Sequence, residues 1–327
     1  MLKTINSTEC QVPKQRVCIN VLGYNNIHDT LECLESIAKL EGDQYPVVFV
    51  DNGSEDKSSE SVGKLFPDVK IIRLPSNLGF SAGMNHGLDL VCKQGYEFCL
   101  MLNNDVILDK AMVNEMLLVA DHHENCAVVM PRIFYLPLKV RNRNSRRNIW
   151  SDGGYYRTFP PSIKLKDNRR NKNLDNPRPI EFAPGCALLI RCKALDKVGL
   201  FDESFFLFFE DWDFSIRVRE AGFSIWCAPQ AILFHKVSRS TLKDPDLYWK
   251  NMGASMSMFI SKHFNKQRAR TYMWFRILRD FFFKPTNFKY LASFRAGVKR
   301  RYQEGFENFP IVADFFIDQD YVGENKE

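Results

Sequence analysis

The first 130 residues alternate between short apolar runs and longer segments whose apolar positions recur at helical spacing. The apolar runs predict strands, and the amphipathic segments predict helices. The predicted strands are 16–22, 47–50, 69–74, 97–102 and 127–130, and the predicted helices are 28–40, 58–66, 81–93 and 111–122. Strands separated by helices are typical of βαβ units, so the pattern predicts an α/β domain built on a mostly parallel sheet with helices flanking it.

The pattern changes after residue 138. The stretch Lys139 to Arg178 is rich in Arg, Lys, Asn and Pro, and we expect a long polar loop or hairpin, either a functional lid or a solvated loop. A strand-like ALLIR, a helix start at Lys193 and a strand AILFH follow, and 248–302 predicts helices rich in Met, Phe and basic residues. These shifts predict a main domain over 1–245, including the loop 139–178, and a helical, basic and aromatic region over 246–327.

Composition narrows the class of protein. The chain has 327 residues, of which 45% are hydrophobic and 26% are charged, as in ordinary globular proteins. Its nine cysteines include no C-x-x-C pair, which predicts reduced thiols in a cytoplasmic protein. The N-terminal residues lack the apolar core of a signal peptide, and no uninterrupted apolar run approaches the roughly 18 residues of a membrane span.

Positive charge is concentrated near the C-terminus. The formal net charge is +6, while residues 262–301 contain twelve Lys and Arg and only one acid, interleaved with Trp and Phe. Such a segment predicts peripheral contact with an anionic membrane, here the inner face of the cell membrane. A helical cap on the core, or a homodimer interface, explains the aromatic residues equally well. Nucleic acid is not expected as a partner, because no recognition motif accompanies the charge.

Polar residues follow two of the predicted strands, at the sheet edge where ligands of α/β proteins bind. Asp51 directly follows the strand 47–50. Its carboxylate can accept a hydrogen bond from an N–H group on the edge of a base, and Asn52 and Ser54 can add further hydrogen bonds. Asn103, Asn104 and Asp105 end the strand 97–102, where a carboxylate could hold a hard cation carrying a diphosphate. Both segments are also typical of Asn/Asp turns.

A third acidic cluster lies in FFEDWDFSIR, residues 208–217. An aromatic, low-dielectric setting raises carboxylate pKa values and favours a general base. On a helix Asp213 can pair with Arg217 at i,i+4, and Glu210 either caps the helix or holds the acceptor, which leaves Asp211 as the candidate base. His235, at the end of AILFH, is either a metal ligand or a satisfied core residue.

These motifs occur in the order found in family 2 glycosyltransferases. The chain carries GYNN, VDNGSED, NLGFSAGMNHG, LMLNND, PGCALLIR and VGLFDESFFLFFEDWDFSIR, followed by the strand-end histidine. Over about residues 16–240 it resembles the rhamnosyltransferase-like branch of that family, which has the GT-A fold. The resemblance implies an inverting transfer from a nucleotide-sugar donor, dTDP-rhamnose or a UDP-sugar, with Mg²⁺ or Mn²⁺. The acceptor it implies is a glycan or lipid-linked glycan of polysaccharide, O-antigen or capsule synthesis.

The resemblance also assigns roles to residues. By position in the motifs, Asp51 binds the pyrimidine base, and Tyr24 and Gly79 line the base and its ribose. Asn52, next to Asp51, is expected to add a hydrogen bond to the nucleotide. Asn103-Asn104-Asp105 occupies the DXD position, where two amides depart from the pattern and leave Asp105 as the main metal ligand. His235 matches a histidine that completes some metal sites, and Asp211 matches the base. The positions near the sugar and the acceptor are Gly185, Cys186, Glu210 and Trp212.

Two other functions fit part of the pattern. A nucleotidyltransferase would also place carboxylates at strand ends, but GYNN lacks the basic residue usual near its first strand. A non-catalytic nucleotide-sugar binding protein would explain the amides at 103 and 104, while the retained Glu210 and Asp211 argue against it.

Overall fold

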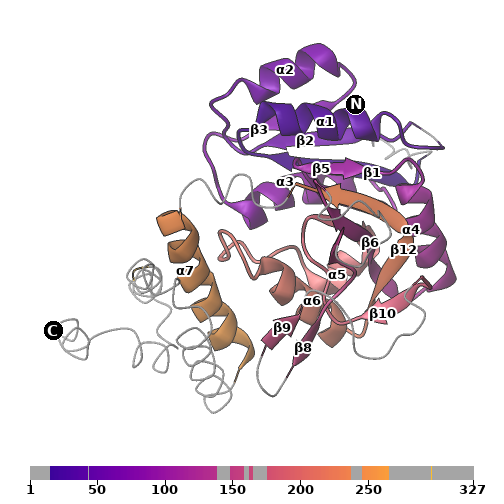
Figure 1. The fold of residues 1–327 in the computed structure, drawn as a ribbon, viewed down its shortest axis with the longest axis vertical. Helices are drawn as coiled ribbons and strands as arrows, with labels where there is room; N and C mark the ends of the chain where they lie inside the picture. The colour runs from indigo at the N-terminus through magenta and orange to yellow at the C-terminus, as the bar shows by residue number, and fades with distance from the viewer. Residues whose placement is uncertain are drawn as a thin grey trace, which may run out of the picture.

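The computed structural model describes residues 15–42, 44–137, 148–157, 162–164, 175–236, 245–264 and 296 (Figure 1). Ten of its strands form one sheet, and two more form a separate hairpin. The sheet strands are β1 Val17–Gly23, β2 Val47–Asp51, β3 Lys70–Arg73, β4 Phe98–Asn103, β5 Val106–Leu108, β6 Cys126–Tyr135, β7 Ile149–Ser151, β10 Arg178–Ile180, β11 Ala187–Arg191 and β12 Ser224–His235.

Most strands of the sheet run in one direction. The order is β10-β12-β6-β11-β4-β1-β2-β3, with β5 added on β12 and β7 on β6. The register makes β12, β6, β4, β1, β2 and β3 parallel to one another, while β11 and β10 run the opposite way. A parallel sheet is normally covered on both faces, which explains why β1 and β4 are almost entirely buried apolar runs.

Helices cover this sheet through their apolar stripes. They are α1 Ile27–Ile37, α2 Ser58–Leu65, α3 Phe80–Lys93, α4 Met112–His122, α5 Leu195–Val198, α6 Glu210–Glu220 and α7 Pro245–His263, with a 3₁₀ turn, η2, at Cys192–Ala194. Helix α3 packs on β1, β2 and β4, and α4 packs on β6 and β12. In Figure 1, α1 and α2 lie at one end of the molecule, and α7 lies well away from them.

The predicted elements of the first 130 residues are all present, with boundaries shifted by a few residues. The largest difference is β6, predicted as 127–130 but ten residues long. It extends because its second half pairs with β12 after an irregularity between Ala228 and Ile232, and because β7 adds to it. Both pairings are long-range, so a local apolar run does not predict them.

The polar stretch contains the expected hairpin. Strands β8 Tyr155–Arg157 and β9 Ser162–Lys164 pair antiparallel, and β7 and β10 join the main sheet from either side of them. The predicted helical region begins with α7 at Pro245. The rest of that region, including nearly all of the basic segment 262–301 and its predicted membrane contact, lies outside the described residues.

The prediction of reduced thiols is wrong for one pair. Cys92, near the end of α3, and Cys192, in η2, form a disulfide although they are 100 residues apart in sequence. The spacing of cysteines in the sequence does not reveal such a pair, because only the folded structure brings α3 and η2 together. The other cysteines among the described residues are free and buried.

Across the described residues, no helix combines the length and the apolarity that a bilayer crossing requires.

Candidate functional site

Five chain segments meet at one edge of the sheet. The carboxyl ends of the parallel strands β1, β2, β4 and β12 are Gly23, Asp51, Asn103 and His235. Because β11 runs antiparallel to β4, its amino end lies at the same edge, with Gly185 and Cys186 just before it. The sheet direction therefore gathers most of the predicted site residues from positions more than 200 residues apart.

The loops after β1 and β2 hold each other. The Ser54 hydroxyl accepts from the Asn25 N–H at 2.8 Å, and Asn25 Oδ1 accepts from the Glu55 N–H at 3.0 Å. The buried carboxylate of Asp51 accepts from the Ser54 N–H at 2.8 Å and from the Ser59 hydroxyl. Tyr24, next to this junction, is 40% exposed, so its ring is open to a ligand.

Asn52 and Gly79 organise the loop that enters α3. The Asn52 amide donates to the carbonyl of Gly79 at 3.0 Å and accepts from the Leu78 N–H at 3.0 Å. Gly79 has a φ of +88°, and a Cβ there would lie 2.6 Å from the Phe206 carbonyl oxygen. These two residues thus shape the loop, and their predicted contacts with base and ribose stay predictions.

Asp105 and His235 are neighbours because of strand β5. Residues 104 and 105 turn the chain from β4 into β5, which pairs antiparallel with the end of β12 so that Val106 lies opposite His235. His235 Nε2 consequently lies 3.2 Å from Asp105 Oδ1, with both side chains largely buried. The Lys236 N–H also donates to the Asp105 carbonyl at 3.0 Å.

The carboxylate of Asp105 and the imidazole of His235 have donor atoms of the kinds that bind a divalent cation. Asp105 Oδ1 is buried and has no hydrogen-bond partner among the described residues, and His235 Nε2, the ring nitrogen 3.2 Å from it, is the second donor atom. No group of three or more His, Cys, Asp or Glu side chains in the described ranges could hold a metal. Two protein ligands are nevertheless typical for Mg²⁺ sites that draw their remaining ligands from substrate phosphates and water.

The two amides of the triplet differ. Asn104 Nδ2 donates to Thr30 Oγ1 at 2.9 Å, which ties the turn to α1. The Oδ1 atom of Asn103 is buried without a hydrogen-bond partner among the described residues. Asn103 therefore has an acceptor to offer a ligand, whereas Asn104 has a structural contact.

Asp211 lies in the first turn of α6 and reaches the segment before β11. Its Oδ2 accepts from the Gly185 N–H at 3.1 Å, and its Oδ1 accepts from the Trp212 N–H at 2.8 Å. Burial raises the pKa of Asp211 to about 6, although these backbone hydrogen bonds act in the opposite direction. A carboxylate with a pKa near 6 is a better proton acceptor than an ordinary aspartate and is still ionised at neutral pH.

Glu210 precedes Asp211 and is more deeply buried. Burial, and secondly the negative charge of Asp211, raise the pKa of Glu210 well above its usual value. Its Oε2 has no hydrogen-bond partner among the described residues. A protonated Glu210 would be a donor, which suits its predicted role of holding an acceptor.

Cys186 connects the two acidic positions. Its carbonyl accepts from the Asn103 N–H at 3.0 Å. Burial, followed by the negative charges of Asp105 and Asp211, raises the pKa of the Cys186 thiol well above its usual value. Because the preceding Gly185 N–H bonds to Asp211, the segment 185–186 links the strand end before Asp105 to the first turn of α6.

Trp212 packs into an apolar cluster. Its ring stacks on Phe182, with centroids 3.6 Å apart and planes within 2°, and only 7% of the residue is exposed. Both rings belong to a second apolar cluster that also contains Met256 and Phe259 of α7. A contact between Trp212 and sugar stays a prediction.

Two contacts of His235 and its neighbour were not foreseen. The ring of Trp150, on β7, lies edge-on to the imidazole of His235 with centroids 4.9 Å apart. Lys236 is buried and pairs with Asp29 at 2.6 Å and with Glu32, both on α1. A lone Trp within a polar stretch was the available signal for Trp150, whereas nothing local in the sequence links Lys236 to α1.

Solved structures share this fold. GalNAc-T7, solved with UDP, GalNAc and Mn²⁺, is 12% identical, with a TM-score of 0.57 over 91% of this chain and 58% of that chain. S. aureus TarS 1-349 in complex with UDP-GlcNAc is 17% identical, with a TM-score of 0.52 over 87% of this chain and 82% of that one. These similarities confirm the predicted GT-A fold.

Curated relatives are similar at the level of sequence. The N-acetylglucosaminyl-diphospho-decaprenol L-rhamnosyltransferase of Mycobacterium tuberculosis is 25% identical over 211 residues, which are 61% of this chain and 69% of the relative. The low-salt glycan biosynthesis hexosyltransferase Agl10 of Haloferax volcanii is 24% identical over 181 residues, or 54% of each chain.

The family model described as glycosyl transferase family 2 matches residues 18–199, more than half of the chain. This range contains the strand ends at Asp51 and Asn103 and the segment around Cys186. The protein is therefore a glycosyltransferase that belongs to glycosyl transferase family 2.

Proposed function

We propose that the protein transfers a sugar from a nucleotide-diphosphate donor to a hydroxyl of a glycan or lipid-linked glycan, with inversion at the anomeric carbon. The observation that carries the proposal is that the adjacent residues Gly185 and Cys186 bond to both acidic segments. The Gly185 N–H donates to Asp211 Oδ2 at 3.1 Å, and the Cys186 carbonyl accepts from the Asn103 N–H at 3.0 Å, two residues before Asp105. Asp105 could then hold the cation of the donor diphosphate while Asp211 accepts a proton from the acceptor in the same site.

Asp211 is the general base in this proposal. It takes the proton of the acceptor hydroxyl while that oxygen forms a bond to the anomeric carbon. The bond from this carbon to the diphosphate oxygen breaks, and the nucleoside diphosphate leaves with the electron pair. General-base assistance contributes about 10²–10⁴-fold. Glu210, whose pKa is raised, would donate a hydrogen bond to an oxygen atom of the acceptor substrate.

Asp105 and His235 would hold Mg²⁺ or Mn²⁺ together with the diphosphate. The bound cation would supply Lewis-acid stabilisation of the leaving diphosphate. Asp51, Tyr24 and the Oδ1 atom of Asn103, which has no hydrogen-bond partner among the described residues, would contact the nucleotide. The loops that carry them are held together by the Asn25, Ser54 and Glu55 hydrogen bonds.

The relatives narrow the choice of substrates. One of them is named as a rhamnosyltransferase acting on a diphospho-decaprenol-linked sugar, and another as a hexosyltransferase of glycan biosynthesis. We therefore propose dTDP-rhamnose or a UDP-hexose as donor and a lipid-linked glycan as acceptor. Contact of residues 262–301 with an anionic membrane surface would suit such an acceptor.

The test starts with a thermal-shift screen of nucleotide sugars with and without Mn²⁺, because a ligand that binds only the folded state raises the unfolding temperature. The donor that gives the largest shift is then offered with a lipid-linked N-acetylglucosamine acceptor, and release of the nucleoside diphosphate is followed. We expect a metal-dependent shift and acceptor-dependent release. Equal shifts with nucleotide sugars and with unrelated nucleotides would contradict the proposal.

A further inference from the structure

Helix α7 contacts the helix that carries Asp211 through a buried carboxylate. Asp213, two residues after Asp211 on α6, has a fully buried side chain with three nitrogen-bearing partners, Arg217, Lys262 and His263. Arg217 Nε lies 2.7 Å from Oδ2, while Lys262 Nζ and His263 Nε2 lie 2.7 and 2.8 Å from Oδ1. Only Arg217 comes from α6 itself, and the other two partners come from the last turn of α7.

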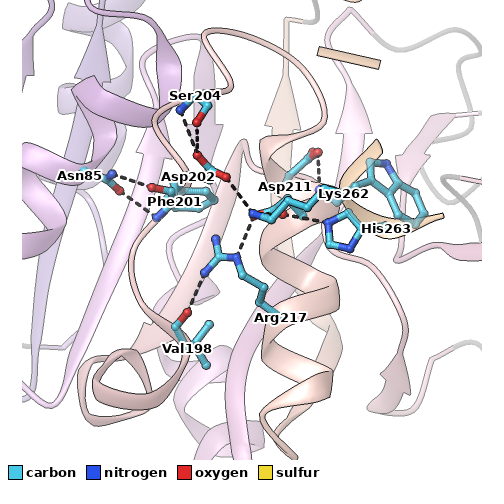
Figure 2. Close-up of polar contacts among 11 residues, drawn as sticks. Asn85, Val198, Phe201, Asp202, Ser204, Asp211, Arg217, Lys262 and His263 are labelled. Carbon is cyan, nitrogen blue, oxygen red and sulfur yellow. Dashed lines mark hydrogen bonds and ion pairs between the residues drawn. The ribbon is translucent and has the colours of Figure 1, made fainter. Parts of the chain in front are cut away.

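Lys262 extends this contact to the loop before α6. Its ammonium group also lies 2.7 Å from Asp202 Oδ2, so it bridges two carboxylates, as Figure 2 shows. The loop is fixed on its other side by α3, because Asn85 donates to the Phe201 carbonyl at 2.9 Å and accepts from the Phe201 N–H at 3.0 Å.

The segment between this loop and Asp211 has an unfavourable backbone. Phe208 and Phe209, directly before Glu210, have φ values of +73° and +66°. Bulky residues in the left-handed region cost about 1–3 kcal/mol each and persist only where the surroundings hold them. Here the Ser255 hydroxyl of α7 donates to the Leu207 carbonyl at 2.7 Å, and Phe209 packs against Phe259 of α7.

We propose that Ser255, Lys262 and His263 of α7 are positioning residues for Asp211, and that α7 holds the strained segment 205–210 in the geometry that the transfer reaction requires. Contacts at two places on α7 support this role: Ser255 bonds to Leu207, and in the last turn Lys262 bridges Asp202 and Asp213 while His263 pairs with Asp213. The inference rests on the proposed function only in taking Asp211 as the base.

The role differs from general stabilisation of the fold. The large core lies around the sheet, and α7 belongs to a second cluster built from aromatic residues beside α6. Its polar contacts to the rest of the chain named above all end between residues 202 and 213. Loosening α7 should therefore change the placement and hydration of Asp211 more than it changes the nucleotide loops, which meet this segment where the Phe206 carbonyl accepts from the Phe80 N–H at 2.7 Å.

The experiment compares single variants of the full chain. Lys262→Met removes the bridge while leaving Arg217 and His263 on Asp213, and Ser255→Ala removes only the hydroxyl bond. Lys262→Arg restores a cation. Lys250→Met is the matched control, because Lys250 lies on the same helix and has no ion pair among the described residues. Each variant is assayed at a temperature well below its unfolding midpoint. The assays measure kcat, donor affinity and the acid limb, which is the decrease of kcat at low pH.

We expect kcat to fall on the order of tenfold or more in Lys262→Met and by less in Ser255→Ala, with donor affinity unchanged. The acid limb should move to lower pH, because water admitted around Asp211 and Glu210 removes the burial that raises the pKa of Asp211. Lys262→Arg should recover most of the rate, and Lys250→Met should match the unmodified protein.

Unchanged kcat in both folded variants would overturn the inference, as would a lower rate with an unmoved acid limb or a loss confined to donor affinity. Asp211→Asn separates the two levels of the argument. Full activity in Asp211→Asn would refute the proposed base itself. An inactive Asp211→Asn beside normal α7 variants would refute only the positioning role.

Discussion

The proposed nucleotide side of the site, around Asp51, Asn52 and Gly79, and the proposed base side, around Asp211, are built in different ways. On the nucleotide side, short polar residues bond to nearby backbone, as Ser54 does with Asn25 and Asn52 does with Gly79. On the base side, aromatic packing and a buried ion cluster hold Asp211, with partners as distant in sequence as Lys262. The first arrangement joins loops 27 and 29 residues apart in sequence, whereas the second depends on an additional helix, with a contact residue 50 positions beyond Asp213.

Two carboxylates on the base side show what this difference does. Burial raises the pKa of Asp211 to about 6. Burial acts in the same direction on Asp213, but hydrogen bonds from His263 and Lys262 and the charge of Arg217 lower its pKa well below the usual value. Two residues on one helical turn thus have pKa values shifted in opposite directions, which suits the proposed base and keeps Asp213 charged.

The largest effect is expected from Asp211→Asn. The amide keeps the size of the side chain but cannot take a proton, so kcat should fall by at least about 10²-fold while nucleotide affinity is retained. Steady-state release of the nucleoside diphosphate measures the rate, and calorimetry measures the affinity. The control is Asp196→Asn, an exposed position on α5, which should leave both quantities unchanged.

Asp105→Ala tests the nucleotide side. Loss of the carboxylate that would hold the cation should weaken donor binding in the presence of Mn²⁺ on the order of 10- to 100-fold, and should change little in its absence. Calorimetric titrations with and without chelator give the two affinities. Equal affinities for both proteins with Mn²⁺ would exclude Asp105 as a metal ligand.

Gly79→Ala tests the place where the two sides touch. A methyl group would meet Phe206 at 2.6–2.7 Å, whereas at Gly222, with a nearly identical φ of +87°, nothing lies within 4 Å. Both substitutions carry the cost of a left-handed alanine, so the difference between them measures the contact. We expect Gly79→Ala to lower the free energy of unfolding by about 1–3 kcal/mol more than Gly222→Ala in denaturant titrations. Equal losses would mean that segment 205–207 does not press on α3.

The smallest effect is a pH dependence. Asp211 accepts protons only when ionised, and its raised pKa places the loss of the ionised form below about pH 6. The kcat should therefore be level above that pH and fall by about tenfold for each unit below it. A profile that is level down to pH 4.5, near the ordinary range of carboxylates, would contradict a buried base.

The sequence predicted features within one strand or helix better than contacts between distant elements. The strand ends at Asp51 and Asn103 follow from apolar runs that stop in polar residues, and the Asp213–Arg217 pair follows from helical spacing. The contact of His235 with Asp105 requires the β5–β12 register, which no local pattern reveals. The disulfide and the partners from α7 were missed for the same reason: each joins segments that only the complete fold brings together.

The central claim is that Asp211 deprotonates an acceptor that attacks the anomeric carbon directly. The most direct test is to determine the anomeric configuration of the first product. Proton nuclear magnetic resonance measures it during early turnover with the donor found in the screen. A single displacement assisted by Asp211 predicts a product of configuration opposite to that of the donor. A product that retains the donor configuration would contradict this mechanism.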